Sequence, residues 1–354
     1  MNHLENIHLI TSKTELIKSL GRYYSKDDNA IIARYRLFDS IPTSFIILSN
    51  SKDTDYQLFI QRFKELSRGC FLHEPLPPKH CVSNIWLIKP AALNQGRGIE
   101  IFNNDLEGML KFIESRPAYS YWVIQKYIER PLLYKQRKFD IRIWAFITSK
   151  SQLYYYTKGY LRTSSEIYTV DSKYNYVHLT NNCLQQNGEK YSVYEEGNTI
   201  SFEKFQSYLD EVHPGVDVEK HLVPRMKDLM IDCFLCVKNF LNPKKRKNSF
   251  ELLGFDFLID EDFRVWLIEV NINPHLGIPN KFIEGLLPKM LNDLFELVLD
   301  CHFKPVNELP KRDIKNQFEL LYSSKQKVNQ RRPFEGGLYP LSNINKSSSA
   351  IYVS

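Results

Sequence analysis

Three oxygen-bearing side chains alternate along a predicted hairpin near the C-terminus. Two apolar stretches joined by a turn at Glu261–Asp262 form this hairpin, and the turn places Asp256 opposite Leu267. Glu269 is then the diagonal neighbour of Asp256, roughly 7–8 Å away on the same face, and Asn271 continues the row because strand side chains share a face at every second position. Two carboxylates and an amide on a half-apolar face suit Mg²⁺, which prefers hard oxygen ligands. A solvated strand face with scattered acids is the alternative.

A lysine followed by a glycine-rich turn could bind phosphate. Lys89 ends an expected strand, and Gly96, Arg97 and Gly98 follow shortly after it. Glycine allows backbone N–H groups to approach phosphate closely, and lysine or arginine supplies the opposite charge. The spacing is not that of a P-loop, so a plain hairpin turn is the other interpretation of this segment.

Charged side chains alternate along another predicted strand. Lys138, Asp140 and Arg142 share one face, while Phe139 and Ile141 share the other. This pattern suits a clamp for phosphate and carboxylate groups, because arginine binds oxyanions bidentately. An exposed strand face is the alternative.

Further polar side chains lie between these segments, on strands or after a loop: Gln125, Lys126, Arg162, His178, Thr180 and Asn181. A histidine alone is more often structural than catalytic. The order along the chain is more informative, since a lysine with a glycine loop precedes a charged strand and an acidic hairpin. This set describes a nucleotide between two sheets, with Mg²⁺ on its phosphates.

The elements that must position these groups interleave along the chain. Expected strands include 44–48, 85–89 and 153–161, and expected helices include 105–115 and 202–212. Because the hairpins require antiparallel pairing, we expect an α+β (mixed α/β) fold rather than a purely parallel sheet.

Composition narrows the class of protein. The chain has 354 residues and a net charge of +6, which is modest for this size and does not indicate a nucleic-acid partner. No apolar run reaches the length of a membrane span, and the first residues lack the pattern of a signal peptide. We therefore expect a cytoplasmic protein with no membrane contact. Local basic segments, such as Arg130–Arg142, could attract an acidic partner.

The chain resembles the tubulin–tyrosine ligase family over roughly residues 80–303. Short blocks in the family's order carry the resemblance: Ile85–Pro90, Gln125–Leu133, Lys138–Arg142, His178–Asn181, Phe250–Phe257 and Trp266–Asn271. Two more blocks, Tyr160–Glu166 and Tyr194–Asn198, resemble the tyrosine-adding members more than the glutamylating or glycylating ones. The family often has a basic residue where Gln95 stands and a small one where Ile272 stands.

The resemblance implies an ATP-grasp fold, with a nucleotide held between two mainly antiparallel sheets. We expect a small N-terminal α/β domain at 1–78, a central ATP-grasp domain at 79–131, a C-terminal ATP-grasp domain at 132–303 and a basic, Ser/Asn-rich, disordered tail at 304–354. ATP and Mg²⁺ are the implied cofactors. The implied partners are a free amino acid and the acidic C-terminal tail of tubulin. We further expect a monomer that acts on cytoskeletal microtubules, with the cilium as a further location.

The resemblance also implies roles for individual residues. The nucleotide would be bound by Lys89, Gly96, Arg97, Gly98, Gln125, Lys126, the backbone of Ile128, Lys138, Asp140, His178, Thr180 and Asn181. The metal ligands would be Asp256, Glu269 and Asn271. The catalytic residues would be Arg142, Arg162, Lys138 and Glu269, with the two arginines neutralising the reacting carboxylate and its acyl phosphate.

The implied activity is ATP-dependent formation of a peptide-type bond on tubulin. A carboxylate is a poor acyl donor, whereas transfer of the γ-phosphoryl group creates an acyl phosphate with a good leaving group. Addition of tyrosine to the C-terminal end of the tail is the first expectation. The alternatives are glutamylation or glycylation of a glutamate side chain, an inactive homologue that only binds tubulin, and an ATP-grasp ligase for a small acid.

Overall fold

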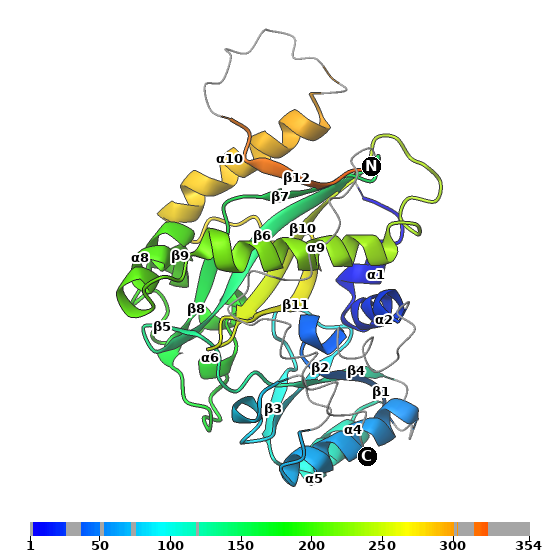
Figure 1. Cartoon of the computed structure of the whole chain (residues 1–354), viewed down its shortest axis with the longest axis vertical. Helices are drawn as coiled ribbons and strands as arrows, with labels where there is room; N and C mark the ends of the chain where they lie inside the picture. The colour runs from blue at the N-terminus through cyan, green and yellow to red at the C-terminus, as the bar shows by residue number, and fades with distance from the viewer. Residues whose placement is uncertain are drawn as a thin grey trace.

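The computed structural model describes residues 3–25, 37–49, 53–71, 76–117, 120–300, 303 and 315–324. Within these ranges the strands form two antiparallel sheets with helices packed on them (Figure 1). The helices are α1 (His8–Thr11), α2 (Lys13–Tyr24), α4 (Thr54–Ser67), α5 (Leu106–Glu114), α6 (Asn175–His178), α7 (Asn182–Gln185), α8 (Phe202–Val212), α9 (Val223–Val237) and α10 (Lys281–Val298), with short helical segments η1 (Pro78–His80), η2 (Glu196–Asn198) and η3 (Val218–Leu222). The strands are β1 (Ser44–Leu48), β2 (Ile85–Pro90), β3 (Glu100–Asn103), β4 (Tyr121–Lys126), β5 (Leu133–Tyr134), β6 (Arg137–Thr148), β7 (Leu153–Tyr156), β8 (Tyr160–Ile167), β9 (Thr199–Ser201), β10 (Phe250–Ile259), β11 (Val265–Ile272) and β12 (Phe318–Tyr322).

The smaller sheet has the order β1-β4-β2-β3, and α4 and α5 pack against it at the bottom of Figure 1. Phe59 of α4 and Met109 of α5 are fully buried in one apolar cluster with Trp86 of β2. Ser44 of β1 lies opposite Gln125 of β4, so the strand pairing links residues on both sides of position 78. The predicted domain boundaries stay predictions.

The larger sheet is built around the long strand β6, which pairs with β10, β7, β8 and β5. On one face of β6, Phe139 and Ile141 point into a core that α2, α8 and α9 complete. The other face is apolar at Trp144, where α10 covers it, and charged from Lys138 to Arg142. Period-two alternation therefore directs the predicted charged row away from the main core.

Two predicted segments differ from the structure. The expected strand 153–161 is divided into β7 and β8, because each pairs with a different part of β6. Part of the expected tail is ordered as β12, which pairs with β7 and buries Phe318 and Tyr322; the rest of 304–354, apart from 315–317, 323 and 324, lies outside the described residues. The other elements named from the sequence are confirmed, as is the mixture of helices with antiparallel strands.

None of the helices that the structure describes combines the length and apolar character needed to cross a bilayer.

Candidate active site

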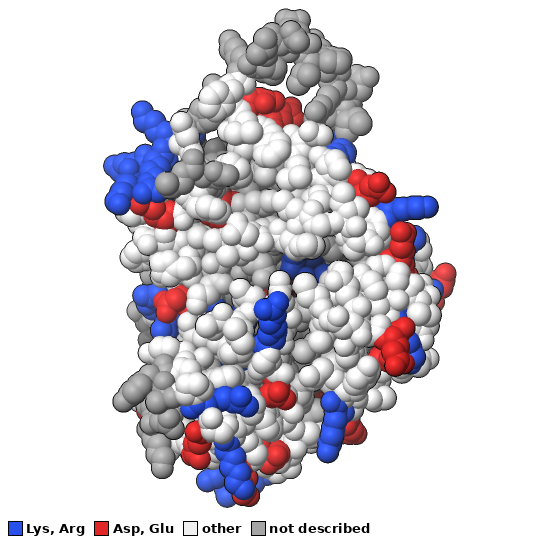
Figure 2. Space-filling model, turned by 180° about the vertical axis from the view of Figure 1, so that it is seen from behind, with Lys and Arg blue, Asp and Glu red and all other residues white. Residues whose placement is uncertain are grey.

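One cleft between the two sheets collects most of the predicted site residues. It encloses about 870 Å³, counting the part open to solvent, which is within the range of roughly 300–1,000 Å³ common for ligand clefts. The predicted residues that line it are Lys89, Gly96, Arg97, Gln125, Lys126, Ile128, Lys138, Asp140, His178, Thr180, Asn181, Asp256 and Glu269. Figure 2 shows basic side chains beside a hollow at the middle of one face. The lysines and the acidic hairpin therefore share one cavity.

Four predicted residues lie outside this lining. Asn271 lines a second, adjoining cavity together with Glu269, and Gly98 packs against Pro90 at the edge of the glycine loop. The remaining two, Arg142 and Arg162, lie behind the acidic side chains and contact the cleft through them.

The acidic hairpin has a different register from the predicted one. Its turn is longer, because the carboxylate of Asp260 accepts hydrogen bonds from the backbone N–H groups of Asp262 and Arg264, each at 3.0 Å. A β-bulge then shifts the pairing beside Asp256, so that Asp256 faces Glu269 directly and not Leu267. A bulge adds one residue to one strand, which local periodicity cannot reveal. The two carboxylates are therefore nearer neighbours than the sequence predicts.

An ion-pair network surrounds Asp256. Its carboxylate accepts hydrogen bonds from both Nε and a terminal nitrogen of Arg142, and it pairs with Arg162 at 2.8 Å. Arg162 also binds Asp140 through Nε at 2.8 Å and through a second nitrogen. Burial alone raises the pKa of Asp256, but the positive charges of Arg142 and Arg162 outweigh burial and hold this pKa well below its ordinary value. The network thus contains two arginines and two aspartates.

Glu269 forms no ion pair with an arginine among the described residues, and only Lys13 and the Asn271 amide oppose the rise of its pKa. Burial raises its pKa first, and the negative charge and hydrogen bond of Asp256 raise it further. Asn271 Nδ2 lies 3.0 Å from Asp256 and 3.1 Å from Glu269, so the amide bridges the two acids. Rotation of this amide by 180° would present its oxygen to the same point. Two facing carboxylates and an amide oxygen form a hard donor set, and these residues fit Mg²⁺.

The lysines across the cleft are buried without a carboxylate partner among the described residues. Lys89 Nζ donates to Gln125 Oε1 at 2.6 Å, and Lys138 Nζ donates to the Tyr127 hydroxyl at 2.9 Å. Burial lowers the pKa of Lys89 to about 8. Burial, followed by the charge of Lys89, lowers the pKa of Lys138 to about 7. The charges of Glu269 and Asp140 oppose these shifts without forming an ion pair with either lysine, and two buried ammonium groups that lack an ion pair fit a polyanion such as a triphosphate.

The glycine loop needs its glycines. Gly96 and Gly98 have φ values of 76° and 68°, a region that other residues seldom adopt. A Cβ atom on Gly96 would lie 3.0 Å from Oδ1 of Asn181, so the loop packs tightly against a residue of the cleft wall. The loop is a tight turn beside the lysines, and its contact with phosphate stays a prediction.

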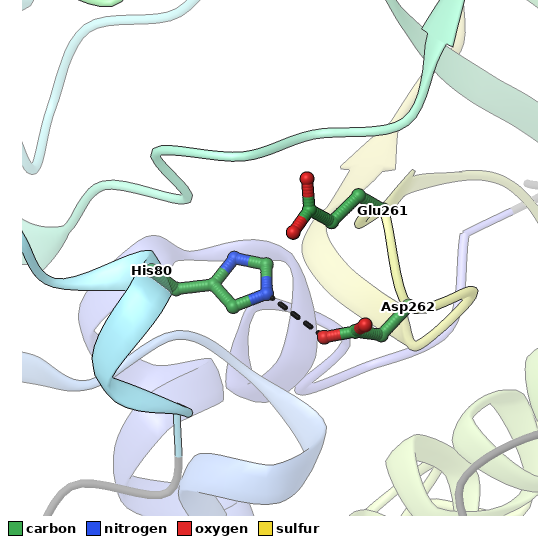
Figure 3. A group of neighbouring side chains, drawn as sticks. All are labelled: His80, Glu261 and Asp262. Carbon is green, nitrogen blue, oxygen red and sulfur yellow. Dashed lines mark hydrogen bonds and ion pairs between the residues drawn. The ribbon is translucent and has the colours of Figure 1, made fainter.

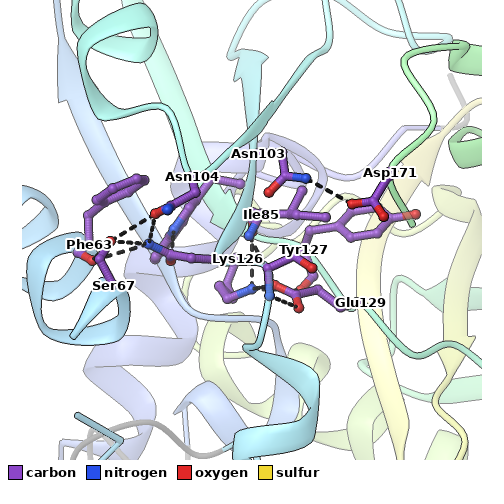
Figure 4. A network of polar contacts seen from close by, with 12 residues as sticks. Phe63, Ser67, Ile85, Asn103, Asn104, Lys126, Tyr127, Glu129 and Asp171 are labelled. Carbon is purple, nitrogen blue, oxygen red and sulfur yellow. Dashed lines mark hydrogen bonds and ion pairs between the residues drawn. The ribbon is translucent and has the colours of Figure 1, made fainter. Parts of the chain in front are cut away.

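Lys126 is placed differently from the other basic residues. Its Nζ lies 2.6 Å from Glu129 Oε1 and donates to the carbonyl of Ile85 at 3.1 Å, and both charged side chains are buried (Figure 4). This ion pair fixes the chain where β4 leaves the smaller sheet. Because the Lys126 side chain is paired with Glu129, we expect only the backbone of Lys126 to contact a nucleotide.

Lys13 and Tyr127 also line the cleft, and neither belongs to the predicted set. Lys13 begins α2 and lines both cavities, and its Nζ donates to the carbonyl of Leu93 at 2.5 Å. Burial lowers the pKa of Lys13, while the charge of Glu269 opposes that shift. Nothing in the local pattern distinguishes Lys13 from other helix lysines, because it reaches the cleft through tertiary packing: α1 packs against β11, and α2 packs against α1.

The basic segment Arg130–Arg142 is less exposed than its composition indicates. Arg137, Lys138 and Arg142 are buried, which leaves Arg130 and Lys135 at the surface. Arg130 in turn pairs with Glu261 at 2.7 Å. Most of this charge therefore acts inside the protein.

Another acidic group has metal-like spacing. Among the described residues, ligand atoms of His80, Glu261 and Asp262 lie within 4.8 Å of one another (Figure 3). Lys79 pairs with Asp262 at 2.5 Å and Arg130 pairs with Glu261 at 2.7 Å, so both carboxylates are already neutralised. These contacts anchor the turn of the acidic hairpin to η1, and the group does not resemble a vacant cation site.

The chain is similar to known proteins over most of its length. The model of the family described as "Tubulin-tyrosine ligase family" matches residues 1–309. The chain is 36% identical over 258 residues to Tubulin glycylase 3C of Tetrahymena thermophila, covering 70% of this chain and 24% of that protein. It is 34% identical over 248 residues to Tubulin monoglycylase TTLL3 of Mus musculus, covering 68% and 26%. With the Probable alpha-tubulin polyglutamylase Ttll1 of Tetrahymena thermophila it shares 28% identity over 322 residues, covering 84% and 71%. The chain spans about a quarter of the length of the glycylases it matches.

Proposed function

This chain belongs to the tubulin-tyrosine ligase family, and we propose that it is an ATP-dependent ligase that adds glycine to glutamate side chains in an acidic tubulin tail. The observation that carries the proposal is the shared cleft, in which lysines without an ion pair face two carboxylates and an amide. That arrangement suits a triphosphate with a divalent cation. We place its action on microtubules, in the cytoplasm or the cilium.

The choice of amino acid follows the relatives. Tyrosine is the first expectation from the sequence, but the similar proteins reported above are named glycylases and a polyglutamylase. They support the alternative, modification of a glutamate side chain. Glutamate is the second candidate, because the polyglutamylase match covers more of both chains than the glycylase matches do.

We propose that the nucleotide lies between the two sheets in the ATP-grasp manner. Lys89 and Lys138 would bind its phosphates, and Lys13 would join them from α2. The backbone of residues 125–128 would bind adenine, since the side chains of Gln125 and Lys126 are already bonded to Lys89 and Glu129. Mg²⁺ held by the acidic hairpin would offset phosphate charge and orient the γ-phosphoryl group.

The acceptor carboxylate would lie beside Arg162. An oxygen of this carboxylate would bond to the γ-phosphorus of ATP as the bond between that phosphorus and the leaving ADP breaks, which gives an acyl phosphate. The amine of the amino acid then bonds to the acyl carbon, phosphate leaves, and a proton is released. Arg142 and Arg162 are already balanced by Asp256 and Asp140. Their contribution is therefore directional hydrogen bonding, and the net positive charge comes from the lysines.

The test is an incorporation assay. The chain is incubated with tubulin, Mg²⁺, ATP and one of glycine, glutamate or tyrosine, and tail peptides are sequenced by mass spectrometry. We expect glycine on a glutamate side chain, and no product with Glu269→Gln. Incorporation of tyrosine alone would contradict the proposal. ATP hydrolysis and incorporation both absent, with tubulin binding retained, would support the inactive binder.

A further inference from the structure

A buried chain of hydrogen bonds ends at Lys138. Its Nζ donates to the Tyr127 hydroxyl at 2.9 Å, this hydroxyl lies 2.9 Å from His178 Nδ1, and His178 Nε2 lies 2.7 Å from the carbonyl oxygen of Ser172. A carbonyl can only accept, so Nε2 carries the hydrogen. Burial lowers the pKa of His178 to about 4, which keeps the ring neutral near pH 7 and leaves Nδ1 as an acceptor. His178 Nδ1 is therefore an acceptor for the Tyr127 hydroxyl, which also contacts Tyr168, and the oxygen of this hydroxyl accepts from Lys138.

The surroundings leave this chain little freedom. Tyr127 is 1% exposed, His178 is 2% exposed and Lys138 is 6% exposed. The two rings meet edge to face, with centroids 5.4 Å apart, and Lys138 Nζ lies 4.2 Å from the centre of the Tyr127 ring. Within the described residues, Lys138 forms no ion pair, although the charge of Asp140 opposes the lowering of its pKa. Its four-carbon side chain would otherwise sample several rotamers.

We infer that Tyr127 is a positioning residue, whose hydroxyl, oriented by His178, holds the Lys138 ammonium where the phosphates of the nucleotide bind. The inference rests on the proposed function, since it needs a triphosphate in this cleft. Tyr127 also follows Gln125 and Lys126 in the segment expected to bind adenine. Tyr127 would therefore lie near the adenine end of the nucleotide and act on the phosphate end through Lys138, without contacting phosphate itself.

The test separates the phosphate end from the adenine end. Binding of ATP, adenosine and inorganic tripolyphosphate is measured by calorimetry for the parent and for Tyr127→Phe, which keeps the ring and removes the hydroxyl. We expect affinity for ATP and tripolyphosphate to fall about ten-fold, the size of one hydrogen bond to a charged group. Adenosine binding should not change. Equal weakening of adenosine would show a merely structural effect, and unchanged tripolyphosphate binding would overturn the inference.

Two further variants make the result specific. Tyr156→Phe is the matched control, because Tyr156 is fully buried and its hydroxyl has no hydrogen-bond partner in the described part of the chain; it should leave all three affinities unchanged. In a Lys138→Met background, Tyr127→Phe should cost nothing more for tripolyphosphate, because the hydroxyl acts through the missing lysine. A full ten-fold loss in that background would contradict the inference.

The outcomes also distinguish the inference from the proposed function. A folded parent that binds neither ATP nor tripolyphosphate contradicts both. If the parent and Tyr127→Phe bind ATP and tripolyphosphate equally tightly, only the role of Tyr127 is contradicted. If Tyr127→Phe does not fold, His178→Phe removes the acceptor one step further along the chain, and a selective loss of tripolyphosphate binding is expected there too.

Discussion

The wall of the cleft around Asp256, here the acidic wall, and the wall that contains Lys89 and Lys138, here the lysine wall, both bury several charges. They balance these charges differently. In the acidic wall, Asp256 forms ion pairs with Arg142 and Arg162, and these positive charges hold its pKa low. Across the cleft, Lys89 and Lys138 bond to an amide oxygen and a hydroxyl, and burial lowers their pKa values to about 8 and about 7. Asp256 is balanced within the protein, whereas Lys89 and Lys138 form no ion pair among the described residues.

This contrast separates stability from binding. Removing one partner from a buried ion pair leaves an unpaired charge and destabilises the fold strongly. Removing a buried charge that has no charged partner relieves a desolvation cost. The acidic wall should therefore respond to mutation mainly through folding, and the lysine wall mainly through nucleotide affinity.

The largest effect is expected for Asp256→Asn. The amide cannot balance Arg142 and Arg162, so the free energy of unfolding should fall by about 3–5 kcal/mol, measured by urea denaturation. Glu203→Gln is the matched control, because Glu203 pairs with Lys158 at an exposed position and should change stability by less than about 1 kcal/mol. Equal losses in the two variants would remove the distinction between the walls.

Lys138→Met should show the opposite pattern. We expect ATP affinity to fall about 100-fold, or roughly 2.7 kcal/mol, while the free energy of unfolding stays the same or rises. Calorimetry and urea denaturation measure the two quantities on one sample. Lys111→Met, which breaks an exposed pair with Glu107, should alter neither. A stability loss as large as that of Asp256→Asn would mean that Lys138 is balanced within the protein.

The lowered lysine pKa values predict a pH dependence of binding. A bound triphosphate raises the pKa of each lysine, because it favours the charged form. Below about pH 7 both lysines are already charged in the free protein; as pH rises through about 7 and then about 8, Lys138 and then Lys89 must take up a proton on binding. ATP affinity should thus fall by about ten-fold or more between pH 7 and pH 9. Calorimetry in buffers of different ionisation enthalpy detects the proton uptake, and a flat profile would contradict the prediction.

Local periodicity predicts the parts of the site that lie on single strands. Lys138, Asp140 and Arg142 share a face as expected, because alternation needs no knowledge of the partner strands. The pairing of Asp256 with Glu269 could not be predicted, because a bulge and the hydrogen bonds of Asp260 set the register. Contributions from distant segments, such as Lys13, depend on tertiary packing.

The block Tyr194–Asn198, which resembles the tyrosine-adding members of the family, has packing contacts in the structure. Asn198 is buried and donates to the carbonyl of Thr163 and to the Ser165 hydroxyl, at 2.9 and 2.8 Å. Glu195 pairs with the buried Arg137. These residues attach a loop to β8 and β6, so their types reflect how that loop packs.

The smallest expected effect concerns Lys13, which lies between the two walls. Its Nζ bonds to the carbonyl of Leu93, and Glu269 is close enough to oppose the lowering of its pKa by burial. If Lys13 belongs with the other lysines, Lys13→Met should weaken ATP binding about five-fold, or roughly 1 kcal/mol, and leave the free energy of unfolding unchanged. Lys18→Met on the same helix is the control, since Lys18 pairs with Glu15 at the surface. A loss of stability with unchanged ATP affinity would instead assign Lys13 to the acidic wall, as the counter-charge that Glu269 otherwise lacks.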